Sequence, residues 1–265
     1  MAKNSGIDWT DHTWNPFQGC RKVSPGCAHC YMYRDKKRYG QDPATVIRSK
    51  PGTFNAPLHW KEPAKVFVCS WSDFFIEDAD EWREEAWDIM RATPHLTYML
   101  LTKRPENIKG RLPMSYEAFG GGWPLKNVWL GVTVESQEMA DKRIPLLLQV
   151  PAAMRFISVE PMIGPVDLTM IHPEGKLYHQ NCLNGWAHDG AFFKDNPDAY
   201  PGDEKIDWVI CGGESGPDAR WMAHEWAFEL KKQCLNAGVP FFMKQMARKE
   251  PIPEFLQGRE FPRSI

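Results

Sequence analysis

The sequence predicts an α/β fold, namely a partial or near-complete parallel (β/α) barrel of six to seven strands that forms a single domain over residues 1–265. Short apolar runs recur along the chain with helix-like stretches between them, which is the pattern of repeated βα units. The runs are apolar at nearly every position, as in strands buried on both faces. A length of 265 residues with 43% hydrophobic content is enough for one large barrel.

The apolar runs place the strands. In chain order they are 65–70, 96–102, 127–134, 154–160, 206–212 and 240–244. A seventh strand is expected before Cys20.

Three helices are predicted between these strands. Residues 80–93 carry apolar side chains at helical spacing, and the carboxylates of the first turn suit the helix dipole. Residues 136–149 have a helical pattern in which Pro145 should produce a kink. Residues 221–237 place Trp226, Leu230 and Cys234 on one stripe and stop at Gly238, a residue suited to ending a helix.

Two segments lack periodicity. Residues from about 169 to 205 are rich in Gly, Pro, Asn, Asp and His, which predicts an insertion between two strands. The tail, from about residue 248 to 265, contains prolines and mixed charge and is expected to pack over the surface.

Composition restricts the classes of partner and the compartment. The formal charge of −2 provides no global basic field, so a nucleic-acid contact would need a local patch. Seven cysteines are an odd number, and the start MAKNSGIDW has no apolar signal region, so we expect a cytoplasmic protein with reduced thiols. No apolar run is long enough to span a membrane, so no membrane partner is expected.

The strongest functional signal is a group of three cysteines, Cys20, Cys27 and Cys30, with six residues in the first gap and two in the second. The longer gap contains the turn formers Ser24, Pro25 and Gly26, which allow all three sulfurs to face one centre. Cysteine thiolates are the usual ligands of iron–sulfur clusters, and three of them leave one iron open to another ligand.

A structural zinc site is the alternative for the same three cysteines. His12 or His29 would then complete a Cys3His set, and the protein would be a zinc-stabilised binding module. Among the other cysteines, Cys69, Cys211 and Cys234 are predicted to be small buried hydrophobes. Cys182, near His179 and His188, is a candidate for a second metal or a reactive thiol.

The cysteine segment, with Tyr31 directly after it, resembles the radical S-adenosylmethionine superfamily. Further matching segments are SWSDFF, LTKRP, GVTVE, SVEP, CGGESG and PFFMKQ, so that the resemblance covers roughly residues 7–245. They are similar to an uncharacterised phage-associated branch with a Cys-x6-Cys-x2-Cys motif, whereas the superfamily usually has three residues in the first gap.

The resemblance implies a barrel of the radical S-adenosylmethionine type and a [4Fe-4S] cluster held by the three cysteines. S-adenosylmethionine would bind the fourth iron, and an electron donor such as flavodoxin or ferredoxin would reduce the cluster. Reductive cleavage of S-adenosylmethionine would then lead to hydrogen abstraction from a substrate. Phage association favours rearrangement or modification of a base in phage DNA or another nucleic acid, including a thymine adduct, and a location in the host cytoplasm.

Polar residues directly after the predicted strands are the candidate site residues, because catalytic groups of such barrels lie at the carboxyl ends of the strands. Ser70, Ser72 and Asp73 suit the ammonium group of S-adenosylmethionine, and Lys103 or Arg104 its carboxylate. The resemblance implies a polar contact from Glu135 to its ribose or methionine part. The remaining candidates are Gly212 and Gly213 for close backbone approach to the cofactor or the substrate, and Glu160, Lys244 and Glu214 as catalytic groups toward the substrate.

A second enzyme class is compatible with the carboxylates. Two of Glu135, Glu160 and Glu214 would serve as the acid and base of a barrel glycoside hydrolase. This alternative leaves the cysteines unexplained. The basic run RDKKR at residues 34–38 is compatible with a nucleic-acid substrate, although a charge run on a helix is more often a solvated face.

Overall fold

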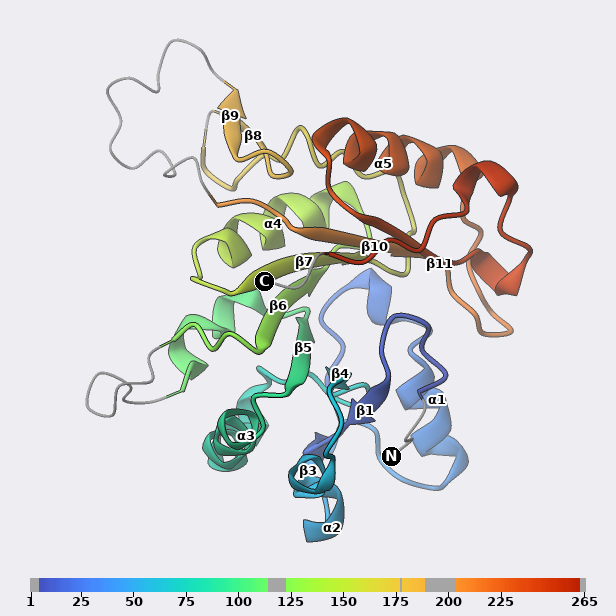
Figure 1. The fold of residues 1–265 in the computed structure, drawn as a ribbon. Helices are drawn as coiled ribbons and strands as arrows, with labels where there is room; N and C mark the ends of the chain where they lie inside the picture. The colour runs from blue at the N-terminus through green and yellow to red at the C-terminus, as the bar shows by residue number, and fades with distance from the viewer. Residues whose placement is uncertain (1–4, 114–122, 177, 189–203, 263–265) are drawn as a thin grey trace. The chain divides into compact units, whose positions relative to one another are not determined.

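The computed structural model describes residues 5–113, 123–176, 178–188 and 204–262 (Figure 1). The chain divides into two compact units. Unit 1 comprises residues 1–132 and 150–154, and unit 2 comprises residues 133–149 and 155–265. Each unit has its own parallel strands with helices beside them.

The strands of unit 1 pair in the order β1, β4, β5, β6, and every pair is parallel. Apolar side chains dictate this pairing, since Tyr98 and Leu100 of the central strand β5 are fully buried. The strands are β1 (His12–Trp14), β4 (Ala64–Val68), β5 (Leu96–Thr102) and β6 (Val128–Thr133). A short antiparallel pair joins β2 (Phe17–Gln18) to β3 (Ile47–Arg48).

The described residues of unit 1 form three α-helices: α1 (Tyr31–Arg38), α2 (Pro51–Phe54) and α3 (Asp80–Ala92). The helix α3 follows the predicted apolar stripe, with Ala86 and Met90 fully buried, and has Asp80 and Glu81 in its first turn. Arg83 is also buried on this helix because its guanidinium donates to the main-chain oxygens of Phe74 and Ile76.

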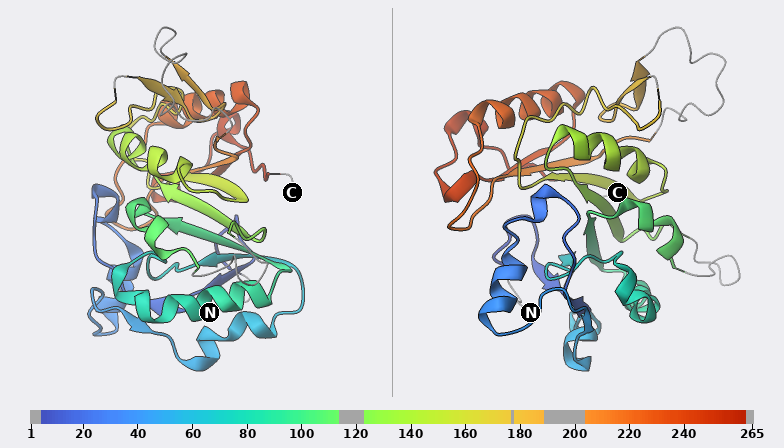
Figure 2. Two further views of the ribbon diagram at one scale, coloured as in Figure 1. Left: turned by 90° about the vertical axis from the view of Figure 1, so that its left-hand side faces the viewer. Right: turned by 180° about the vertical axis from the view of Figure 1, so that it is seen from behind.

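Unit 2 contains a second set of parallel strands in the order β7, β10, β11. Their bounds are β7 (Met154–Val159), β10 (Trp208–Gly212) and β11 (Phe241–Gln245). Every residue of β7 and β10 is buried, as the continuous apolar runs predict. The helices α4 (Gln137–Leu148) and α5 (His224–Ala237) lie on one side of these strands (Figures 1 and 2).

The two helices of unit 2 differ from the prediction in detail. The helix α4 runs through Pro145 as one element. The helix α5 begins at His224 rather than at Trp221, and its buried stripe is Ala227, Leu230 and Cys234. Trp226 is only partly buried because it packs against the exposed ring of Trp221, 5.4 Å away between centroids.

The predicted insertion contains a hairpin of β8 (His179–Asn181) and β9 (Trp186–His188). A bridge between Ile171 and Gln180, and a hydrogen bond from His172 N to Asp141 Oδ1, connect the hairpin to α4. Residues 189–203 of the insertion lie outside the described residues. In the tail, Arg259 bridges to Phe242 of β11, so that the described part of the tail packs along this strand.

The prediction of an α/β fold with parallel strands is confirmed, and the expected seventh strand is β1. Closure into a barrel and organisation as a single domain stay predictions. No helix within the described residues has the length and apolar content needed to cross a membrane.

Candidate functional site

The three cysteines lie on one loop of unit 1 that leads from β2 to α1. In the longer gap, Pro25–Cys27 form a single 3-10 turn in which Cys27 N donates to Ser24 O at 2.9 Å. This is the turn expected from Ser24, Pro25 and Gly26. Cys30 is the residue directly before α1, so its thiol lies at the amino end of that helix.

All three cysteines are partly exposed, and none of them forms a disulfide. Tyr33 of α1 holds the start of the cysteine loop, because its hydroxyl donates to the main-chain oxygen of Cys20. Burial raises the pKa of Tyr33, and electrostatic interactions with Cys20, Cys30 and Cys27 raise it further. In the described part of the chain, however, no group of three or more His, Cys, Asp and Glu side chains is already arranged as a metal site.

The start of the cysteine loop is held by the segment that follows β4. Gly19 N donates to Trp71 O at 2.9 Å, and Ser72 Oγ donates to Gly19 O at 2.6 Å. Gly19 has φ +101°, and a Cβ atom there would lie 2.1 Å from Thr45 O, so only glycine fits. Ser72, predicted to bind a cofactor ammonium group, therefore contacts the cysteine loop itself.

Asn15 is a residue of this site that the sequence analysis missed. Its side chain donates to Ser70 Oγ at 3.0 Å and accepts from Trp71 N at 2.8 Å. Ser70, like Ser72, is thus engaged by the amino-terminal segment. A buried asparagine just after a strand, in the run Trp14-Asn15-Pro16, was the available signal.

Asp73 is buried, and its carboxylate accepts four hydrogen bonds, which fills the four acceptor positions of the group. The donors are Phe75 N at 3.0 Å, Thr102 Oγ1 at 2.7 Å, Lys103 N at 3.0 Å and Arg104 Nη1 at 3.3 Å. This carboxylate ties the end of β5 to the segment after β4. The expected contact of Asp73 with an ammonium group is not favoured by this arrangement.

Arg104 is buried and reaches the cysteine loop. Its Nη1 atom lies 3.6 Å from Cys20 Sγ, and Nη2 donates to Arg21 O at 2.8 Å. Burial and the charge of Asp73 raise the pKa of Cys20 to about 11, although Arg104 lowers it. The side chain of Lys103 is the second cation at this end of β5, and the residue is partly exposed.

In unit 2, Glu160 and Lys244 meet at the carboxyl ends of β7 and β11, where they form an ion pair. Both side chains keep about a fifth of their surface exposed, 18% for Glu160 and 20% for Lys244. Gly212 lies beside them, because a Cβ atom at this position would be 3.3 Å from Glu160 Cδ. The structure thus places three of the candidate site residues next to one another, namely Glu160, Lys244 and Gly212.

Gly213 and Glu214 make close contacts with other residues of unit 2. A Cβ atom on Gly213 would lie 2.4 Å from Ala247 N, and Gln245 Nε2 donates to Gly213 O at 2.7 Å. Glu214 accepts from Arg220 N at 2.8 Å and pairs with the Arg220 guanidinium. Gly213 thus provides the predicted close backbone approach, but to its own chain.

Glu135 is fully buried and bound to an arginine that the sequence analysis missed. Arg143 Nη1 lies 2.7 Å from Glu135 Oε2 and also donates to Thr133 O at 2.8 Å. The signal was an arginine on the buried face of α4, between Ala140 and Ile144. A contact of Glu135 with ribose or methionine would require this pair to open.

The remaining cysteines behave as buried apolar residues. Cys69, Cys211 and Cys234 are all buried, as predicted. Cys182 is fully buried too, its Sγ lies 3.2 Å from Leu168 O, and burial raises its pKa well above the usual value. A reactive thiol at Cys182 is therefore not favoured.

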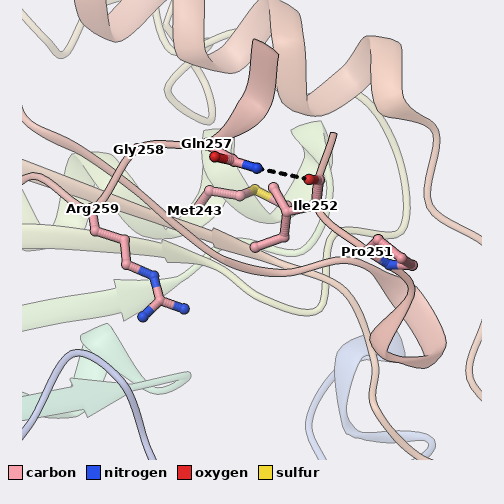
Figure 3. A pocket seen from close by; sticks show the side chains of 6 residues that line it. All are labelled: Met243, Pro251, Ile252, Gln257, Gly258 and Arg259. Carbon is pink, nitrogen blue, oxygen red and sulfur yellow. Dashed lines mark hydrogen bonds between the residues drawn. The ribbon is translucent and has the colours of Figure 1, made fainter. Parts of the chain in front are cut away.

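A separate pocket of about 560 Å³ lies between β11 and the tail (Figure 3). Its walls are mainly apolar, and the side-chain amide of Gln257 is already directed to Ile252 O at 3.4 Å. The lining residues are Met243, Pro251, Ile252, Gln257, Gly258 and Arg259. No predicted site residue lines this pocket.

A family model described as "Protein of unknown function (DUF5131)" matches residues 4–259. No curated protein and no solved structure matches the chain.

The substitution Gly19→Ala is expected to destabilise unit 1, because the added methyl group combines a positive φ with a clash against Thr45 O. We expect the free energy of unfolding in urea to fall by about 3 kcal/mol. Gly40→Ala is the control, since Gly40 has φ +67° but no atom within 4 Å of an added Cβ, and should cost only about 1 kcal/mol. Equal losses in the two variants would contradict the clash.

The substitution Glu135→Ala should leave the buried charge of Arg143 without its partner. We expect a loss of about 3–5 kcal/mol in the free energy of unfolding. The double variant Glu135→Leu/Arg143→Met should regain most of it, because it removes both charges and keeps apolar volume. A single variant as stable as the parent protein would show that the ion pair is not structural.

Proposed function

This chain belongs to that family of unknown function, and we propose that it is a radical S-adenosylmethionine enzyme. In this proposal Cys20, Cys27 and Cys30 hold a [4Fe-4S] cluster, and S-adenosylmethionine completes the coordination of the fourth iron. The observation that carries the proposal is a loop with three partly exposed thiols that form no disulfide, held in place by side chains that follow the carboxyl ends of two parallel strands.

The chemistry of this donor set fits an iron–sulfur cluster. Thiolates are soft ligands, and the loop supplies three. Of the two candidates for a fourth zinc ligand, His12 lies in β1 and packs its ring against Trp60, with 4.7 Å between centroids. His29 is exposed on the loop itself. The packing of His12 disfavours it as a fourth ligand, so that His29, between Cys27 and Cys30, is the remaining candidate for a Cys3His zinc set.

When bound, the cluster and S-adenosylmethionine would supply a 5′-deoxyadenosyl radical that removes hydrogen from a substrate, after one electron from flavodoxin or ferredoxin. The residues of this chain orient the participants. Ser72 and Arg104 hold the cysteine loop. We assign Lys103 to the carboxylate of S-adenosylmethionine, because the Arg104 guanidinium is already bound to Cys20, Asp73 and Arg21.

The ion pair of Glu160 and Lys244 supports a role toward the substrate. A lysine ammonium and a carboxylate in contact provide a proton donor and an acceptor side by side, and both remain partly exposed. We propose that the substrate is a base in phage DNA or another nucleic acid, such as a thymine adduct that is rearranged or modified. The exposed cations of α1, which directly follows Cys30, support this class; they are Arg34, Lys37 and Arg38.

The contacts disfavour a glycoside hydrolase. Such an enzyme needs two carboxyl groups that face one sugar, one of them protonated. Glu135 is fully buried against Arg143, whereas Glu160 and Glu214 are each paired with a cation.

Metal analysis tests the central proposal. Anaerobically purified protein should be brown, absorb near ~400 nm and contain about four irons per chain. The triple variant Cys20→Ser/Cys27→Ser/Cys30→Ser should lose the iron, while the control Cys234→Ser should keep it because this buried thiol lies in α5. With dithionite and S-adenosylmethionine, only proteins that hold iron should release 5′-deoxyadenosine. Colourless protein with one zinc would reject the proposal.

Substitution of the ion pair tests the substrate role. Glu160→Gln and Lys244→Met should each lower the yield of altered nucleoside from phage DNA by about 100-fold. Iron content and 5′-deoxyadenosine formation without DNA should stay unchanged. Lys232→Met, which breaks an exposed ion pair with Glu229 on α5, is the control. If the parent protein releases 5′-deoxyadenosine but alters no phage DNA or nucleotide, the nucleic-acid substrate is wrong.

A further inference from the structure

We infer that Arg104 is the positioning residue for Cys20, the first of the three cluster ligands, and that its charge raises the reduction potential of the cluster. The inference rests on the proposed function. Arg104 Nη1 lies 3.6 Å from Cys20 Sγ and 3.3 Å from Asp73 Oδ2, and Nη2 lies 2.8 Å from Arg21 O. One guanidinium thus contacts both the ligand sulfur and the main chain of the next residue.

The orientation of this guanidinium is determined by the protein. Arg104 Nη1 and Thr102 Oγ1 both donate to the carboxylate of Asp73. Thr102 Oγ1 in turn accepts a hydrogen bond from the main-chain nitrogen of Arg104 at 2.9 Å. The side chains of Arg104 and Asp73 are only 5% and 6% exposed. Arginine suits this position because its planar fork reaches several acceptors at once, whereas a lysine ammonium acts as a point charge.

The contact distinguishes Cys20 from the other two ligands. The guanidinium of Arg104 donates a hydrogen bond to the sulfur of Cys20. Cys27 and Cys30 lie instead at the 3-10 turn and at the amino end of α1. Hydrogen bonds and positive charge at a cluster sulfur stabilise the more negative, reduced state, which raises the reduction potential. Loss of the cation should therefore make the cluster harder to reduce.

The test compares Arg104→Gln, Arg104→Lys and the control Arg111→Gln, which removes the same charge from an arginine paired with Asp80. After anaerobic reconstitution, resistance of the cluster to EDTA should fall by about 10- to 100-fold in Arg104→Gln, as for other outer partners of metal ligands. Its midpoint potential, followed by electron paramagnetic resonance, should shift downward. Arg104→Lys should restore most of the potential but not the resistance, and Arg111→Gln should match the parent protein.

The double variant Asp73→Asn/Arg104→Gln is included in case Arg104→Gln alone fails to fold. It removes both buried charges together, so that neither is left without its partner. It should fold, as judged by circular dichroism, and still show the lowered potential and the weak resistance to EDTA. If the parent protein holds the cluster and the folded Arg104 variants match it in both measurements, the inference is overturned and the proposed function stands. If the parent protein itself takes up no iron, the proposed function fails, and the inference fails with it.

Discussion

The arrangement of the cysteine loop depends on the carboxylate of Asp73. Buried among four donors, it joins the segment after β4 to the end of β5 and sets the direction of the Arg104 side chain. A buried carboxylate is stable only when its acceptor positions are filled, and here main-chain amides, a hydroxyl and a guanidinium fill them. Because Arg104 then reaches Cys20 Sγ and Arg21 O, the polar contacts inside unit 1 extend directly to the candidate ligands.

The strands could be predicted closely from sequence because burial on both faces leaves a continuous apolar signal. β5 has the predicted bounds, 96–102, and β7 differs from its predicted range only at the last residue. β1 could be expected only as a strand somewhere before Cys20, since three residues carry little pattern. The start of α5 was misplaced because Trp221 and Trp226 pair with each other near the surface instead of entering the core.

The candidate site was harder to predict, because a polar residue after a strand has the same sequence signature whether it binds a ligand or its own chain. Ser72 and Gly213, predicted to lie at a cofactor, both contact the backbone of neighbouring loops. Glu135 has its partner eight residues further along, where an arginine on the apolar face of α4 was the available signal. The three cysteines remained recognisable because thiols at this density are rare in a core or on a solvated face.

Separate contacts hold the two ends of the longer cysteine gap, at Cys20 and at Cys27. Cys20 is held from the strand side through Gly19 and Arg104, whereas Cys27 is held by its own 3-10 turn. The residues directly after Cys20 are exposed but tied to the protein, since Arg21 pairs with Asp78 and Lys22 Nζ donates to Ala28 O. The gap is therefore held along its length, by these contacts near Cys20 and by the 3-10 turn at Cys27. Cys20 and Cys27 are thus positioned by different parts of unit 1, so that a change at one anchor leaves the other in place.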